Sequence, residues 1–378
     1  MEIKKNYLIV GIVTCLILIV GIIFLKNNMN ETSYSKIYQK WQREYIVKNG
    51  EGSFVNTVKA GKKQALSEAQ GYGMVITMLA AKKKYTDQSA YDKLVAFYTK
   101  NTIPGKKFMY WKLVEKEDKW ENVDQSNATD GDLDIAYSLI LADQMWGSTG
   151  KYNYRQMAKQ ILSDLLTSNY NQRTHLLRVG NWATDSSGMG NLIRTSDLIP
   201  SYYKTFYQYT HNETWRTIYY KSIDVLGKLS NQNSTGLFPD FAWINGNDVA
   251  AAEGKVIEKD TDGDYSWNAC RIPLRLSLVR DKRLRKINDK LLTFFNKQRK
   301  IEAGYSLNGQ TLANYQSMAF LAPIGVAANL QKSKFPQLAK ELKKQILQTK
   351  LTGNYYGDTL QTYSAMVLAN QRGVQDSE

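Results

Sequence analysis

Histidine, cysteine and proline are scarce in this sequence. Its 378 residues include only two His, two Cys and six Pro. Two His and two Cys are too few for a Cys/His zinc cluster or an iron–sulfur site, and we expect neither a metal nor another cofactor. Cys15 lies in an apolar run and Cys270 far downstream in a polar context, so a disulfide framework is excluded. The low proline content permits long, uninterrupted helices.

Aromatic and basic residues, by contrast, are abundant. The chain has 25 Tyr and 8 Trp, and its 43% apolar residues are enough to form a proper core. Lys and Arg number 50 against 35 Asp and Glu, a net charge of +15. Such a charge either attracts polyanions and anionic surfaces or belongs to a lysine-rich, solvated exterior. The sequence has no zinc-finger, RNP or basic-zipper pattern, and we expect no nucleic-acid partner.

The first 34 residues differ in composition from the rest. Residues 7–25 form an uncharged apolar run of 19 residues, close to the roughly 20 that span a bilayer. Lys4 and Lys5 precede the run, which predicts that residues 1–6 stay in the cytoplasm and that the rest of the chain is exported. No small-residue cleavage site follows, so the sequence predicts a single-pass signal anchor retained in the cell membrane. Residues 26–34 are polar and are interpreted as a short tether.

Helical periodicity dominates residues 35–372, which we interpret as one domain. Apolar residues recur at spacings of three and four in eleven segments, and a weaker pattern near 36–47 indicates a twelfth. Continuous β-branched alternation is rare, so a sheet core is not expected. Helices of similar length arriving in pairs favour an all-α toroid or solenoid. The eleven segments are 64–84, 88–100, 132–146, 154–168, 196–209, 213–230, 270–280, 282–297, 311–328, 335–348 and 358–370.

Two further segments stand out by composition. Residues 236–268 form an acidic, aromatic and turn-rich connection, and an irregular connection of that length in a compact domain is usually functional. Residues 280–300 are rich in Lys and Arg. We interpret this second segment as a solvated helical face.

The first acidic motif is Glu68, which opens an apolar helical run. Gly71 and Gly73 follow it within the helix, and each glycine costs roughly 1 kcal/mol of helix stability relative to alanine. Glycines at such positions indicate the close approach of a ligand or of another backbone. Alternatively, Ser67 caps the helix and Glu68 merely complements the helix dipole.

The second acidic motif comprises Asp130, Asp132 and Asp134. Their alternating spacing is similar to that of a calcium loop, but the glycine is misplaced and no glutamate closes the loop, so no metal site is predicted. Thr129 or Asp130 is a reasonable cap for the following helix. Capping accounts for one acidic residue there but not for three.

These motifs resemble those of glycoside hydrolase family 8. The run ATDGDLDIAYSLILADQMW at 128–146 resembles the family signature, and SEAQGYGM at 67–74 resembles its acid motif. The resemblance covers residues 60–370 and implies an (α/α)6 barrel that cleaves a β-linked polysaccharide internally and with inversion. Three further motifs follow in the family's order: RTSDLIPSYY at 194–203, GLFPD at 236–240 and YSWNACRIPLR at 265–275.

The resemblance also assigns catalytic roles. Glu68 is the general acid, and Asp130 matches the aspartate that binds the sugar at the cleavage point. The usual base position holds Asn268, whose amide is not a useful proton acceptor. An asparagine subgroup of the family takes its base from a glutamate in the preceding loop, which indicates Glu258 here. The alternative bases are Glu253, Asp240 and Asp264.

Aromatic and polar side chains of the motifs and connections are expected to bind substrate. Aromatic rings suit the C–H face of a pyranose, although most tryptophans in a helical domain belong to its core. Arg271 and Arg275, one turn apart, either hold the cleft carboxylates or pack structurally. The predicted substrate-binding residues are Tyr72, Trp111, Trp182, Asp197, Tyr202, Asp240, Trp267, Asn268 and Arg271.

Three functions are consistent with these features. The first is a monomeric, membrane-anchored glycosidase that acts outside the cell on a cell-surface polysaccharide or exopolysaccharide, because a short tether confines the domain to the surface. Anchored family 8 proteins associated with exopolysaccharide synthesis are similar in arrangement. The second is a non-catalytic glycan-binding protein on a degenerate hydrolase scaffold, which is motivated by Asn268 at the usual base position. The third is a polysaccharide lyase on a similar toroid, which would need an anionic substrate of the kind that the basic surface suits.

Overall fold

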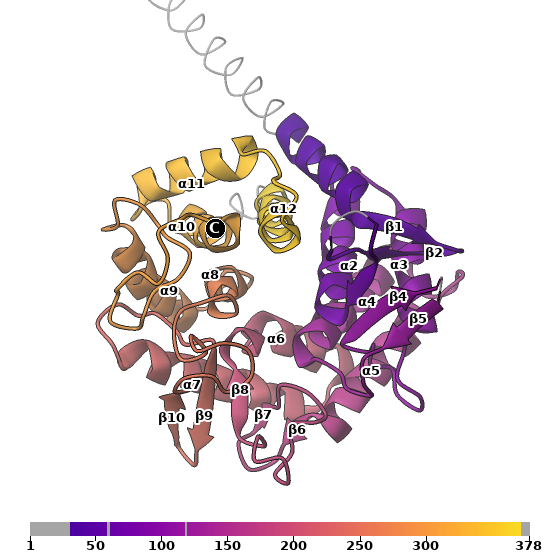
Figure 1. Ribbon diagram of the computed structural model, residues 1–378, viewed down its shortest axis with the longest axis horizontal. Coiled ribbons are helices and arrows are strands. Elements are labelled where there is room, and N and C mark those ends of the chain that lie inside the picture. Colours follow the sequence, from indigo (N-terminus) through magenta and orange to yellow (C-terminus); the bar gives the residue numbers. More distant parts are fainter. Residues whose placement is uncertain (1–30, 59–60, 118, 372–378) are drawn as a thin grey trace, which may run out of the picture.

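The computed structural model describes residues 31–58, 61–117 and 119–371. Twelve helices in this part of the chain alternate between the inner and the outer ring of one toroid (Figure 1). Each inner helix contacts the next, and the last contacts the first, so the inner ring is closed. The inner helices are α2 (Ser67–Lys82), α4 (Thr129–Trp146), α6 (Pro200–Thr210), α8 (Ile272–Leu276), α10 (Met318–Leu330) and α12 (Tyr355–Asn370).

The outer helices differ from the inner ones in their sequence pattern. Residues 357–369 of the inner helix α12 are all buried, whereas the outer helices bury one apolar stripe against the inner ring. This arrangement agrees with the predicted (α/α)6 barrel. The outer helices are residues 31–45, α3 (Gln88–Lys100), α5 (Tyr154–Ser168), α7 (Glu213–Asn231), α9 (Lys282–Phe295) and α11 (Pro336–Gln348).

The two ends of the toroid carry different connections. Turns of two to seven residues join each inner helix to the next outer helix, at 83–87, 147–153, 211–212, 277–281 and 331–335. Such short turns make consecutive helices antiparallel, so all inner helices begin at the same end. The long connections lead from outer to inner helices and therefore gather at that end.

All the strands in the described residues belong to these long connections. They form four small antiparallel sheets, ordered β1–β2, β3–β4–β5, β6–β7 and β8–β9–β10. The helical core is therefore all-α as predicted, and the strands lie outside it, in the connections. Their bounds are β1 (Ile46–Asn49), β2 (Gly52–Val55), β3 (Gln64–Leu66), β4 (Lys112–Lys116), β5 (Lys119–Asn122), β6 (Tyr170–Asn171), β7 (Leu176–Leu177), β8 (Leu192–Arg194), β9 (Phe241–Asn245) and β10 (Asp248–Ala251).

Most of the eleven predicted helical segments differ from the structure by at most three residues at an end, whereas those at 196–209, 270–280 and 311–328 differ by more. The helix predicted at 311–328 begins at Met318, because Leu312 and Tyr315, which supplied the apolar spacing, are 40% and 51% exposed. Ser317 caps this helix by accepting a hydrogen bond from the backbone N–H of Ala319. The helix predicted at 270–280 is shorter and ends at Leu276.

The N-terminal predictions are tested only in part. Residues 31–34, the last part of the predicted tether, are helical, and Tyr34 is fully buried in the core. The predicted anchor at 7–25 lies outside the described residues. Within the part of the chain that the structure describes, no helix has both the length and the apolar character needed to span a bilayer.

Glycines bring the first turns of α2 and α4 together. A Cβ on Gly71 would lie 2.8 Å from the carbonyl oxygen of Gly131, and one on Gly131 would lie 2.6 Å from the backbone nitrogen of Glu68. Backbone atoms cannot move aside as a flexible side chain can. The close approach indicated by Gly71 is therefore an approach of another backbone, and it places the two acidic motifs side by side.

Gly131→Ala is expected to destabilise the protein. The new Cβ overpacks the α2–α4 contact, and overpacking costs about 1–3 kcal/mol, which exceeds the roughly 1 kcal/mol that alanine gains in a helix interior. The free energy of unfolding from urea titration measures the change. Gly150→Ala is the matched control, because nothing lies within 4 Å of its Cβ position. Equal stability of the two variants would contradict the packing argument.

Candidate active site

The N-termini of the inner helices carry a cluster of charged and polar side chains. Glu68 and Asp130 lie in the first turns of α2 and α4. Arg194 ends β8, and Arg271 ends the 3-10 turn Ala269–Arg271 before α8. Tyr355 is the first residue of α12. Because all inner helices begin at one end, residues distant in sequence meet there.

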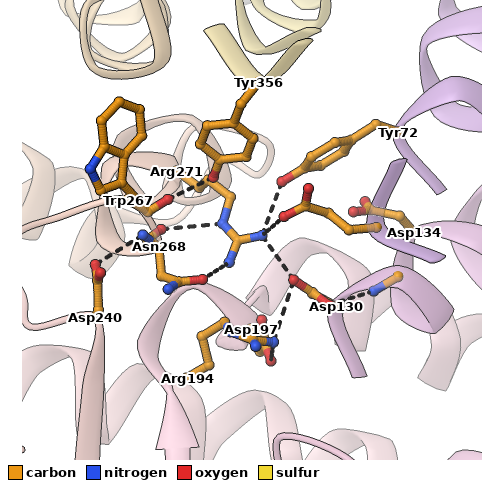
Figure 2. Close-up of polar contacts among 12 residues, drawn as sticks. Tyr72, Asp130, Asp134, Arg194, Asp197, Asp240, Trp267, Asn268, Arg271 and Tyr356 are labelled. Atoms are coloured by element: carbon orange, nitrogen blue, oxygen red, sulfur yellow. Dashed lines mark hydrogen bonds and ion pairs between the residues drawn. The ribbon is translucent and has the colours of Figure 1, made fainter. Parts of the chain in front are cut away.

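Arg271 lies at the centre of this cluster (Figure 2). Its Nη1 contacts Glu68 Oε2 at 3.1 Å and Asp130 Oδ2 at 2.9 Å, and it also donates to the Tyr72 hydroxyl at 3.1 Å. Its Nη2 donates to Asn268 Oδ1 at 2.7 Å. The Arg271 side chain is only 1% exposed. One buried guanidinium therefore fixes both acidic motifs and the asparagine relative to one another.

Glu258 joins the same cluster from the long β10–α8 connection. Its Oε2 accepts a hydrogen bond from Asn268 Nδ2 at 3.2 Å, and its Oε1 lies 3.5 Å from Arg194 Nη2. The Glu258 side chain is 38% exposed, against 19% for Glu68. Both carboxylates thus border solvent, on either side of the Arg271–Asn268 pair.

The alternative bases lie in other surroundings. Within the described residues, no hydrogen bond or ion pair joins the Glu253 or Asp264 carboxylate to Arg194, Asn268 or Arg271. Asp240 is 3% exposed, and its Oδ1 accepts the backbone N–H groups of the 266–269 segment at 2.6–3.2 Å. Its carboxylate is occupied in holding the loop, so we reassign Asp240 from substrate contact to positioning residue.

The two carboxylates of the acidic motifs have opposite pKa shifts. Burial raises the pKa of Glu68 to about 7, although the Arg271 guanidinium opposes this shift. Burial also opposes ionisation of Asp130, but the guanidiniums of Arg194 and Arg271 outweigh it and lower the pKa of Asp130 to about 2. At neutral pH Glu68 therefore retains a large protonated fraction, whereas Asp130 is ionised. Such a divided pair is typical of acid–base sites.

Arg194 and Tyr355 are the site residues that the sequence did not reveal. Arg194 Nη1 lies 3.4 Å from Asp130 Oδ2 and 3.5 Å from Asp197 Oδ2, in addition to its contact with Glu258. The Tyr355 hydroxyl donates to Glu68 Oε1 at 3.3 Å. Among the described residues, the Asp197 carboxylate contacts the cluster through Arg194, and burial raises its pKa to about 7.

Tyr202 is placed beneath the site rather than in it. It is fully buried, and its hydroxyl donates to Asp134 Oδ1 at 2.6 Å. Arg275 forms a fork with the same carboxylate, at 2.8 and 2.6 Å. Tyr202 therefore belongs to a second, structural polar layer, which also answers the open question about Arg275.

The three predicted tryptophans lie in the connections at the open end. Trp182 is 39% exposed. Trp111 donates its indole N–H to Asp124, and its carbonyl accepts the backbone N–H of Ser67, next to Glu68. Trp267 precedes Asn268 and is half-buried, with the Lys259 ammonium 5.3 Å from its ring. Their role as sugar platforms remains a prediction.

A carboxyl group that retains a large protonated fraction at neutral pH, beside an ionised carboxylate, is what glycoside hydrolysis requires. The chain belongs to the glycosyl hydrolases family 8, whose family model matches residues 18–371. It is therefore a glycoside hydrolase, of an inverting family of endo-acting glycanases.

Similar proteins are named for activity on glucans. A β-glucanase of Niallia circulans is 30% identical over 359 residues, which cover 90% of this chain and 84% of that protein. The apo structure of a β-1,3-1,4-glucanase from Paenibacillus sp. X4 is also 30% identical, with a TM-score of 0.83 over 91% of this chain and 92% of that one. A cold-adapted family 8 xylanase has a TM-score of 0.72 at 18% identity, over 88% and 90% of the two chains, and shares the fold.

Proposed function

We propose that this protein is an endo-acting β-glucanase in which Glu68 is the general acid and Glu258 the general base. Glu68 donates its proton to the glycosidic oxygen. Glu258 removes a proton from the water that attacks the anomeric carbon from the opposite face, so the configuration inverts. The observation that carries the proposal is the contact of Glu258 with Asn268 and Arg194 in the same cluster as Glu68.

The remaining residues have supporting roles in this scheme. Ionised Asp130 accepts a sugar hydroxyl group at the cleavage point. Arg271 and Asn268 lie between acid and base and hold the two carboxylates apart, as the ~6.5–9.5 Å separation of an inverting pair requires. Arg194 keeps Glu258 turned toward the site. The glycan-binding alternative was motivated by Asn268, and it loses that motivation if Glu258 supplies the missing carboxylate.

A β-linked glucan is the proposed substrate class. The relatives of 30% identity are named as a β-glucanase and a β-1,3-1,4-glucanase, and the site's carboxylates need no metal to cleave a neutral polymer. The apolar run at 7–25 and its basic flank support the proposal that the enzyme is anchored in the cell membrane with the toroid outside. It then acts on a surface polysaccharide or exopolysaccharide.

Incubation of the full chain with mixed-linkage β-glucan tests this proposal. An endo-acting enzyme lowers the viscosity of the solution long before reducing ends accumulate, because each internal cut halves a long chain. Retention of the polymer without cleavage would instead support the glycan-binding function. Xylan and a cellulose derivative serve as comparison substrates.

The pH dependence of kcat/KM follows from Glu68. Glu68 is an active acid only while it is protonated. Activity is therefore lost as the pH rises through its pKa of about 7. We expect kcat/KM to fall about tenfold for each unit above pH 7, while Asp130, with a pKa of about 2, adds no limb in this range. Initial rates on soluble β-glucan at low substrate measure the profile. A flat profile from pH 6 to about 9 would contradict the assignment.

A further inference from the structure

The end of the toroid opposite the active site has a composition of its own. We name as the back face the five short turns that follow inner helices, at 83–87, 147–153, 211–212, 277–281 and 331–335. These turns contain six Lys and Arg but only two Asp and no Glu. By contrast, the connection 232–268 at the open end has seven Asp and Glu against two Lys. The open-end connections 46–66, 101–128, 169–199, 232–268, 296–317 and 349–354 together hold 18 Lys and Arg and 16 Asp and Glu. The back face therefore has the larger basic excess for its size, and the acidic excess of the open end is confined to 232–268.

The acidic side chains of the back face are used within the protein. Asp87 caps α3 by accepting the backbone N–H of Ala90, and Asp281 caps α9 by accepting that of Arg283. Most of the basic side chains are exposed to solvent, and one of them, Lys334, also forms an ion pair with Asp289 at 3.0 Å. The exposed members are Lys84, Lys151, Arg280, Lys332 and Lys334, and the adjoining helix ends add Lys82, Lys282 and one carboxylate, Glu213.

Two large apolar side chains lie among these charges. Met145 and Leu330 are each 41% exposed, in the last turns of the inner helices α4 and α10. Exposed apolar side chains within a basic surface are typical of proteins that lie on lipid headgroups, where the cations meet phosphates and the apolar groups enter the acyl boundary.

The chain also enters the toroid at the back face. Glu31, the first described residue, lies 3.5 Å from Lys83, which follows the C-terminal end of α2. The other end of that first helix lies at the open end, where Tyr45 packs edge-on against Tyr355. Figure 1 shows this helix in the outer ring. The apolar run ends at Leu25, and residues 26–30 reach at most about 17 Å even when fully extended.

We infer that the back face is a docking surface for an anionic lipid bilayer, which holds the active site facing away from the membrane. This inference rests on the proposed anchor, because the short reach of residues 26–30 brings the back face close to the headgroups. The basic turns are drawn to the anionic surface, and the acidic connection 232–268 is repelled from it. The electrostatic attraction thus sets the orientation of the domain, and the active site stays accessible to polymer.

The reactivity of individual lysines tests the inference in the full chain. The protein is assembled into lipid nanodiscs of phosphatidylcholine, either alone or with about 30% phosphatidylglycerol, and acetylation rates are followed by mass spectrometry. Lys84, Lys151 and Lys282 report on the back face. The controls Lys48, Lys255 and Lys350 are also exposed and lie in the connections of the open end.

We expect the anionic lipid to slow acetylation of the back-face lysines about threefold or more relative to the controls, and ~0.5 M salt to remove the difference. The triple variant K84Q/K151Q/K282Q is expected to lose the protection of Lys334, which the variant K48Q/K255Q/K350Q keeps. Equal relative rates in both lipids would overturn the inference. Protection by soluble polyphosphate, but not by anionic discs, would overturn it too and assign the face to an anionic polymer.

Failure of the docking inference can be distinguished from failure of the proposed anchor or of the proposed hydrolase activity. Neutral discs offer the back face no charged partner, so loss of the protein from them reports on the anchor alone. If the neutral discs do not retain the full chain, the docking inference is tested on preformed anionic vesicles, with the same lysines as reporters. Hydrolysis of β-glucan is measured separately, and it depends on Glu68 rather than on the back face.

Discussion

Glu68→Gln is expected to lower kcat/KM on β-glucan by about 10³-fold or more, within the 10²–10⁴-fold that a positioned general acid typically contributes. Glutamine keeps the size of the side chain and its contact with Arg271, but it has no proton to give to the leaving oxygen. Its neutral amide also resembles the protonated acid, so the fold is preserved. Initial rates of reducing-end release measure the loss.

Two controls separate proton donation from structural damage. Glu44→Gln removes an exposed carboxylate from the first helix and should leave the rate unchanged. An aryl glycoside with an acidic phenol as leaving group needs little proton assistance, so Glu68→Gln should cleave it with a far smaller loss than the polymer. Equal losses on both substrates would contradict the role of Glu68 as the acid.

Glu258→Gln is expected to reduce turnover by about 10²–10⁴-fold on every substrate, including the aryl glycoside, because the attacking water then has no base. The side chain lies at the rim, 38% exposed, so its loss is expected to change stability little. Azide needs no deprotonation, and it should restore cleavage by giving a glycosyl azide of inverted configuration. Product analysis by NMR identifies that compound.

The alternative bases supply the matched comparison. Glu253→Gln and Asp264→Asn remove carboxylates from the same connection and should retain most of the activity. The double variant E258Q/N268D moves the carboxylate to the usual family position, where it is expected to recover part of the lost rate. If Glu258→Gln kept full activity and Glu253→Gln or Asp264→Asn lost it, the residue whose substitution lowers the rate would be the base instead.

Local signals in the sequence were sufficient to predict most of the helices and to indicate Glu68 as the general acid. Apolar stripes mark the outer helices, and Gly71 marks the contact with α4 because no other residue fits there. The pattern failed at 311–317, where Leu312 and Tyr315 repeat at helical spacing but are exposed. Spacing alone does not report which face is buried.

Contacts between residues far apart in the sequence could not be predicted from local signals. Tyr355 meets Glu68 across 287 positions of the sequence, and Arg194 meets Glu258 only because both long connections end at the open end of the toroid. Tyr202 and Asp240 lie in motifs and have polar groups, yet both are buried and bonded to the protein. Residue type indicates what a side chain is able to do, whereas burial decides whether substrate reaches it.

The anomeric configuration of the first products tests the central claim most directly. The full chain is mixed with soluble β-glucan, and proton NMR follows the new reducing ends before mutarotation equilibrates them. Attack by water from the face opposite to Glu68, with Glu258 as base, predicts that the α-anomer appears first and that Glu258→Gln abolishes it. First release of the β-anomer, or of unsaturated ends, would contradict the account.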